Sequence, residues 1–131
     1  MDSVIAHYKD LLLRLFASPK LAFDENLRRS LPNKGGVYRV FEKGINWDRS
    51  RYFGKTGDLQ NRVYGDLLMG NLPRHTLKKK LVESGEFTDK AAAKEYLKAK
   101  CYVQILPIDD ENERTLFEHF AIAILKPESN D

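Results

Sequence analysis

The sequence has few of the features that mark secreted, membrane and zinc-binding proteins. Cys101 is the one cysteine among 131 residues, so neither an internal disulfide nor a thiolate zinc site can form. No apolar run approaches the ~20 residues that a membrane-spanning helix needs. Residues Met1 to Lys20 also lack the basic start and continuous apolar segment of a signal peptide. We therefore expect a cytosolic (cytoplasmic) protein with no membrane partner, and Cys101 is expected to be a small buried residue.

The excess of positive over negative charge is small for the whole chain, but the charges are distributed unevenly along it. The formal net charge is +3, yet residues 49–100 hold 12 Lys and Arg against 6 Asp and Glu, whereas residues 101–131 hold 2 against 7. A basic middle segment suits a protein that binds nucleic acid, because neutralising phosphates releases counterions. The same lysines would also be explained as solvated helix faces. Composition leaves both interpretations open.

The glycine-bounded stretch after residue 34 predicts a hairpin that leads into a helix. Val37, Arg39 and Phe41 alternate with Tyr38 and Val40, which is the pattern of a half-buried strand. A second strand ends at Gly54, and the charged residues from Glu42 to Arg51 form a long hairpin loop. Asp58 is suited to cap the helix that follows.

The remaining periodicity predicts one domain over residues 1–131, with 1–30 as a helical N-terminal extension. A third strand is expected over 101–108, and helices over 3–16, 24–30, 58–69, 75–83, 89–100 and 112–125. A chain with 42% hydrophobic residues has enough apolar surface for a modest core. The predicted fold class is α/β in the α+β sense, a small three-stranded antiparallel sheet flanked by helices.

The last helix contains an acidic residue in apolar surroundings. Apolar residues before and after Glu118 occupy most of the circumference of this helix, so we expect the helix to be largely buried. A carboxylate in such a place is costly unless it meets a cation, a metal or a specific donor. The candidates are therefore a metal ligand or a structural ion pair with a basic residue.

Two tripeptides in the predicted hairpin carry a family resemblance. Gly36-Val37-Tyr38 and Tyr52-Phe53-Gly54 resemble the two signatures of the GIY-YIG nuclease superfamily, each with a changed middle residue. Arg62 follows eight residues after Gly54, Glu118 lies in the last helix, and Asn130 follows twelve residues later. The resemblance covers about residues 31–130. It implies a GIY-YIG-like fold and an endonuclease that cuts DNA with Mg²⁺ or Mn²⁺.

The resemblance also implies a role for each matching residue. Glu118 would hold the metal, Arg62 would stabilise the phosphate, and Tyr38 with Tyr52 would prepare the attacking water. Free tyrosine has a pKa near ~10, so such a role requires help from a neighbouring cation. Lys55 is either that cation, a phosphate contact or a turn lysine.

Two more residues follow from the resemblance alone. His75 is similar to a histidine that some family members use for proton transfer or phosphate contact, and Asn130 to an asparagine that supports the site. His119 is expected to be structural, because it points elsewhere on the helix that carries Glu118.

Other functions remain compatible with the sequence. The chain is alternatively a catalytically silent nucleic-acid-binding module or a subunit of a larger nuclease complex. The sequence also leaves open DNA against RNA, the preferred substrate, a role in repair, restriction, homing or phage biology, and a monomer against a homodimer.

Overall fold

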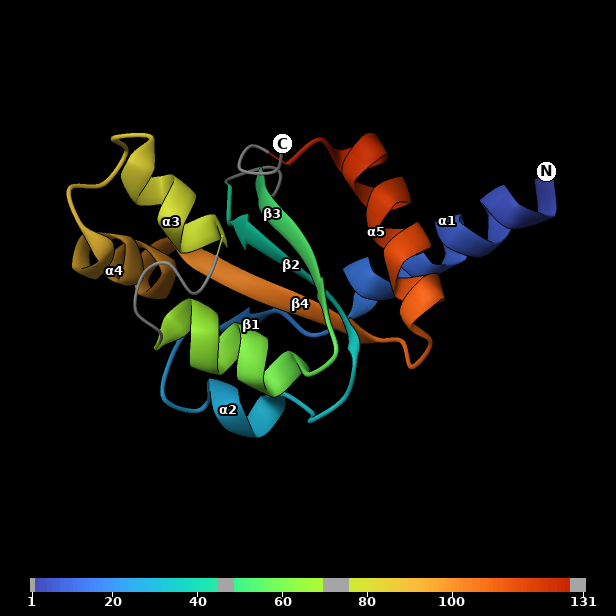
Figure 1. The fold of residues 1–131 in the computed structure, drawn as a ribbon, viewed down its shortest axis with the longest axis horizontal. Coiled ribbons are helices and arrows are strands. Elements are labelled where there is room, and N and C mark those ends of the chain that lie inside the picture. The colour runs from blue at the N-terminus through green and yellow to red at the C-terminus, as the bar shows by residue number, and fades with distance from the viewer. Residues whose placement is uncertain (1, 45–48, 70–75, 128–131) are drawn as a thin grey trace.

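The fold is an antiparallel sheet covered by helices on both faces (Figure 1). The structure is a computed structural model that describes residues 2–44, 49–69 and 76–127. The four strands are β1 (Leu21–Ala22), β2 (Gly36–Glu42), β3 (Arg49–Thr56) and β4 (Cys101–Pro107). The helices are α1 (Asp2–Ala17), α2 (Leu27–Ser30), η1 (Gln60–Leu68), α3 (Thr76–Glu83), α4 (Lys90–Lys100) and α5 (Glu111–Leu125). None of the helices in these residues is long and apolar enough to span a membrane.

The predicted fold class is confirmed, but the predicted number of strands is wrong. The sheet has four strands in the order β1-β4-β2-β3, and every pair is antiparallel. The additional strand lies in the N-terminal segment, where Leu21 and Ala22 pair with Val103 and Tyr102 of β4. Two residues are too few to show an alternation of apolar and polar residues, so β1 could not be predicted from periodicity.

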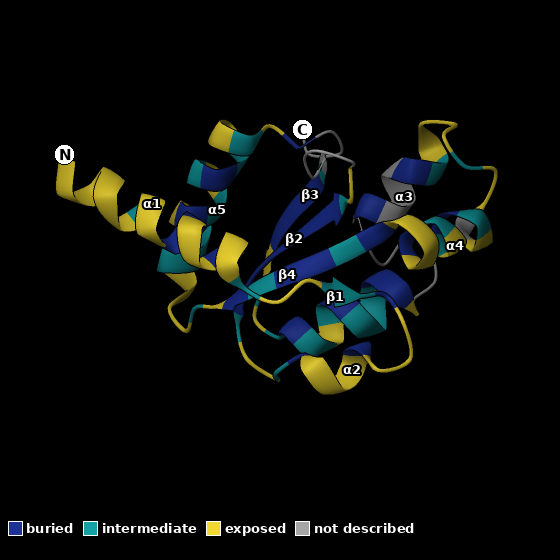
Figure 2. Ribbon diagram, turned by 180° about the vertical axis from the view of Figure 1, so that it is seen from behind, coloured by how far each residue is buried: buried dark blue, intermediate teal, exposed yellow. Residues whose placement is uncertain are grey.

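Strand β2 is buried on both faces, although the alternation in its sequence predicted a half-buried strand. Tyr38 and Val40 face a core formed with α2, η1, α3 and α4. Val37 faces the opposite way, into a core formed with α1 and α5. Figure 2 shows the same arrangement, with the central strands buried and the outer sides of the helices exposed.

A β-bulge in β3 interrupts the pairing with β2 between Val40 and Phe41. Phe41 pairs with Ser50 and Val40 with Tyr52, so Arg51 is an extra residue in β3. Arg51 is buried, contacts the Tyr96 ring and donates a hydrogen bond of 2.6 Å to Glu86. The register is regular from the Gly36–Thr56 pair to the Val40–Tyr52 pair, so Tyr52 lies on the same face as Val40 and Tyr38 whether or not the bulge is present.

The ends of several helices follow the sequence predictions. Asp58 accepts a hydrogen bond of 3.1 Å from the backbone N–H of Asn61, and Asp89 caps α4 by accepting from Ala92. Gly85, with a φ of +81°, follows the end of α3. Helix η1 is wider than an α-helix, because its N–H···O=C bonds include one from Met69 to the residue five positions earlier.

Helix α5 differs from its prediction. We expected it to be largely buried, but only Phe117 and Ala121 are buried, while Leu116 is 46% and Ile124 59% exposed. The helix packs against β3, β2 and α1 with one side only. This half-open position leaves Glu118 between the core and the solvent.

Candidate active site at the outer edge of β3

The ring of Tyr38 crosses β3 directly above Gly54. The two residues are cross-strand partners, and a Cβ atom added at Gly54 would lie 2.5 Å from Cζ and 2.6 Å from Oη of Tyr38. A glycine is therefore needed here because the ring approaches the backbone too closely for any side chain. In the described sheet β3 pairs with β2 alone. The hydroxyl of Tyr38 consequently extends toward the outer edge of the sheet.

Tyr52 lies beside Tyr38 on the same face. Their ring centroids are 6.1 Å apart, and the ring planes are inclined by 35°. Both tyrosines also belong to the core formed with η1, α3 and α4. They therefore fill core volume and bring two phenols close together.

Arg62 of η1 is hydrogen-bonded to Tyr38, and its guanidinium also donates to Asp66 at 3.3 Å. Burial lowers the pKa of Arg62, but Tyr38, Asp66 and Tyr52 raise it, so that it lies above its ordinary value. The guanidinium is thus a permanent positive charge beside the two phenols. The sequence analysis missed Asp66, although its i+4 spacing from Arg62 was a usable signal.

Glu118 reaches the same edge of the sheet from α5. Its carboxylate accepts a hydrogen bond from the backbone N–H of Lys55 in β3. Burial raises the pKa of Glu118, and the positive charges of Lys55 and His119 only partly oppose this. Among the residues that the structure describes, Glu118 has no salt bridge. The alternative of a structural ion pair therefore finds no partner there.

The electrostatics of Tyr38 link the four groups. Burial raises the pKa of the Tyr38 phenol, Tyr52 and Glu118 raise it further, and Arg62 opposes the rise. Tyr38 is therefore within electrostatic reach of all three other groups. The structure brings Tyr38, Tyr52, Arg62 and Glu118 together from β2, β3, η1 and α5.

Of the other residues considered in the sequence analysis, the structure describes Lys55 and His119 but not His75 and Asn130. The side chain of Lys55 is exposed and lies close enough to Glu118 to influence its pKa. His119 is exposed on the helix that carries Glu118. His75 and Asn130 lie outside the described residues, so their predicted roles remain predictions.

The donor set fits a hard divalent cation bound by few protein ligands. The described residues contain no group of three or more His, Cys, Asp or Glu that could hold a metal, so a metal site with several carboxylates is absent there. Burial raises the pKa of the half-buried Glu118 carboxylate, so a bound cation would stabilise its ionised form. Mg²⁺ keeps several waters and takes one or two carboxylates. A single glutamate with phenol oxygens nearby fits such an ion.

Comparisons with known proteins give one group of similar structures. No protein-family model matches the chain, and no curated protein sequence matches it. The solved structures that match include the GIY-YIG N-terminal endonuclease domain of UvrC from Thermotoga maritima bound to magnesium, its catalytic divalent cation. It is 22% identical, with a TM-score of 0.49, over 82% of this chain and 99% of that chain. A tyrosine-to-phenylalanine mutant of that domain matches equally, at 22% identity and a TM-score of 0.49, over 82% of this chain and 98% of that one. The chain is thus similar to structures of the family that its sequence motifs resemble, and a similarity of this size carries no functional argument by itself.

Proposed function

We propose that the chain is a metal-dependent endonuclease that hydrolyses phosphodiester bonds in DNA. The observation that carries this proposal is the meeting of a carboxylate, a guanidinium and two phenols at the outer edge of β3. A protein that only binds nucleic acid needs cations for the phosphates, but a half-buried carboxylate would repel them. The carboxylate of Glu118 is therefore explained by catalysis better than by binding alone.

Glu118 would hold Mg²⁺ or Mn²⁺, with water molecules completing the coordination. When bound, such an ion supplies Lewis acidity that activates water and neutralises charge on the phosphoryl oxygens. The backbone N–H of Lys55 orients the Glu118 carboxylate through their hydrogen bond. The exposed side chain of Lys55 is suited to contact an adjacent phosphate.

Arg62 would bind the scissile phosphate. Its planar guanidinium matches two phosphate oxygens at once, which a lysine ammonium does not. The contacts with Tyr38 and Asp66 hold the fork in one orientation. We assign Asp66 as a positioning residue because it acts through Arg62.

Tyr38 would position the attacking water. Because burial raises its pKa, the phenol is neutral at pH 7 and its hydroxyl both donates and accepts hydrogen bonds. It therefore acts as a neutral partner of the water, not as a free phenolate. Tyr52 packs beside it and fixes the position of its ring.

Nicking of a supercoiled plasmid tests this proposal. We expect nicking with Mg²⁺, none after chelation, and a rate roughly a hundredfold to a thousandfold lower in Glu118→Gln, the range for loss of one electrostatic group. Glu111→Gln is the matched control, because Glu111 is an exposed glutamate in the first turn of the same helix. Circular dichroism would verify that both variants are folded. DNA binding without metal-dependent nicking would instead favour the silent binding module.

A further inference from the structure

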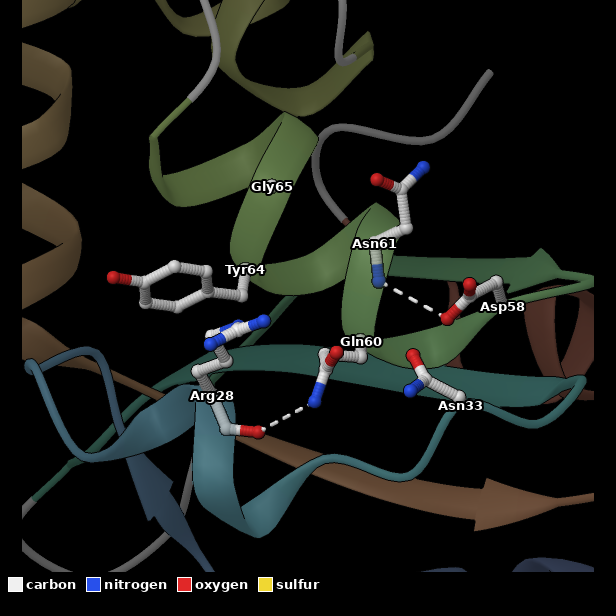
Figure 3. A pocket seen from close by; sticks show the side chains of 7 residues that line it. All are labelled: Arg28, Asn33, Asp58, Gln60, Asn61, Tyr64 and Gly65. Carbon is white, nitrogen blue, oxygen red and sulfur yellow. Dashed lines mark hydrogen bonds between the residues drawn. The ribbon is translucent and has the colours of Figure 1, made fainter.

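The helix that carries Arg62 also borders a separate cavity of about 220 Å³ (Figure 3). Asn61, Tyr64 and Gly65 line it from η1, and Arg28 and Asn33 line it from α2 and the segment that follows α2. Arg62 itself does not line this cavity. The cavity and the candidate active site are therefore formed by different residues of one helix.

The walls of the cavity are fixed by hydrogen bonds. The side-chain amide of Gln60 donates to the carbonyl oxygens of Arg28 and Leu31 at 3.0 and 3.2 Å, which ties η1 to α2. Asp58 accepts from the backbone N–H of Asn61, as the dashed lines in Figure 3 show. The two Gln60 bonds connect the sides of the cavity that η1 and α2 form.

The polar groups that line the cavity have capacity for a ligand. Within the described part of the chain, no hydrogen bond or ion pair engages the side chains of Arg28, Asn33 or Asn61. Each asparagine amide offers two N–H donors and one acceptor oxygen, and Arg28 offers further donors. A ligand with both donors and acceptors would suit these groups.

The composition of the lining selects the kind of ligand. Asparagine and arginine are among the side chains that pair with base edges, and tyrosine rings and guanidinium planes stack on bases. Asp58 and Arg28 both line the cavity, and their opposite charges leave it without a net preference for an anion such as phosphate. The volume of about 220 Å³ lies below the ~300 Å³ of the smallest usual drug-sized sites. That space suits a single heterocyclic ring better than a larger ligand.

We infer that this cavity binds an unpaired nucleobase of the nucleic-acid strand whose phosphate Arg62 contacts. This inference rests on the proposed nuclease function. It adds a substrate class, because a base can enter the cavity only when it is not paired within a duplex. Such a base would fix the position of the strand relative to the cut.

Binding of free deoxynucleosides tests the cavity without any cleavage. These ligands carry no phosphate, so they do not depend on Arg62. In NMR spectra of the full chain we expect millimolar amounts of at least one of the four to shift the side-chain amide signals of Asn33 and Asn61. Gly65→Leu should abolish the shifts, because a Cβ atom at Gly65 already lies 3.2 Å from Oδ1 of Asn61.

Two more variants provide a test that does not depend on correct folding of Gly65→Leu. Asn33→Ala should weaken nucleoside binding, since Asn33 is exposed and lies outside the helices and strands. Asn112→Ala is its control, because Asn112 is an exposed asparagine in α5 away from the cavity. Absence of any nucleoside-induced shift, shifts that persist in Gly65→Leu, or shifts caused only by inorganic phosphate would overturn the inference.

A cleavage experiment then connects the cavity with the active site. Oligonucleotides with one abasic site at successive positions near the cut should include one position at which the wild-type rate falls roughly tenfold to a hundredfold, the worth of one stacked base. Gly65→Leu should be insensitive to that position. Cleavage that ignores every abasic site would overturn the inference and leave the nuclease proposal intact. Nucleoside binding without any cleavage would overturn the nuclease proposal and retain the cavity as a base-binding site.

Discussion

Arg39 and Arg62 lie on opposite faces of the sheet, and their surroundings differ. Arg39 of β2 is 6% exposed, lies over the rings of Phe16 and Phe41, and donates to Ser50 and Gln104 at 2.9 and 2.8 Å. Arg62 is 27% exposed and contacts a phenol and a carboxylate. The partners of Arg39 named here are aromatic or uncharged, whereas Tyr38 and Asp66 beside Arg62 are titratable.

The partners therefore indicate the role of each cation. Gln104 accepts a hydrogen bond from Arg39 through its side-chain oxygen and donates through its amide nitrogen to the carbonyl oxygens of Phe16 and Ser18. Through Gln104, Arg39 therefore helps to connect the end of α1 to the sheet. Arg62 joins η1 to Tyr38 of β2, but its side chain is 27% exposed, so a ligand can reach its guanidinium from the solvent. We infer that Arg39 stabilises the fold and that Arg62 serves catalysis, and the following variants test this contrast.

The largest effect is expected from Arg62→Lys. The ammonium keeps the charge but loses the planar fork, so we expect plasmid nicking to fall by about a thousandfold while the melting temperature stays near that of the wild type. Arg29→Lys is the control, because Arg29 is exposed on α2. Wild-type nicking by Arg62→Lys would contradict a phosphate-binding fork at this position.

Arg39→Met should show the opposite behaviour. It removes the hydrogen bonds to Ser50 and Gln104 and leaves the buried Gln104 oxygen without this donor. We expect the free energy of unfolding, measured in urea, to fall by about 3 kcal/mol. The nicking rate per folded molecule should remain unchanged. A loss of activity at unchanged stability would show that the two arginines do not differ as proposed.

Gly54→Ala should affect both properties, because its neighbour belongs to the core and to the site. The new Cβ atom would lie 2.5 Å from Cζ of Tyr38, which must move. We expect about 2 kcal/mol of lost stability together with a clear loss of nicking. Gly57→Ala is the matched control, since no heavy atom lies within 4 Å of a Cβ atom there. Equal behaviour of the two variants would argue against close packing of Tyr38 on β3.

A smaller effect is expected from Asp66→Asn. If Asp66 only orients Arg62, the turnover rate should fall roughly tenfold, equal to about 1.4 kcal/mol, with little change in DNA affinity. In combination with Arg62→Lys the effect should disappear, because the fork that Asp66 orients is then absent. Additive losses in the double variant would assign Asp66 a role of its own.

The sequence predicted the site in part, because its motif residues are local signals. The glycine-bounded strands, Asp58 and Asp89 follow rules that act over a few residues. The role of Gly54 depends on a ring in a neighbouring strand, and Arg39 on residues as distant as Gln104. Such contacts between distant parts of the chain leave no periodic signal. The cavity beside η1 was missed for the same reason, since Arg28 and Asn61 meet only after folding.

The last prediction concerns pH, because the burial of Tyr38 should change how the free energy of unfolding depends on pH. Burial, more than any other cause, raises the pKa of Tyr38 above its ordinary value, so the folded chain keeps this proton while an unfolded tyrosine loses it above pH ~10. Rising pH then favours the unfolded state, and the free energy of unfolding should fall. Tyr38→Phe should reduce that slope by up to about 1.4 kcal/mol per pH unit. Burial and a hydrogen bond to Glu42 also raise the pKa of Tyr96, so Tyr96→Phe should reduce the slope without lowering the nicking rate at neutral pH. An unchanged slope in Tyr38→Phe would mean that the phenol is not buried as described, whereas a reduced slope with full nicking would remove Tyr38 from the catalytic proposal.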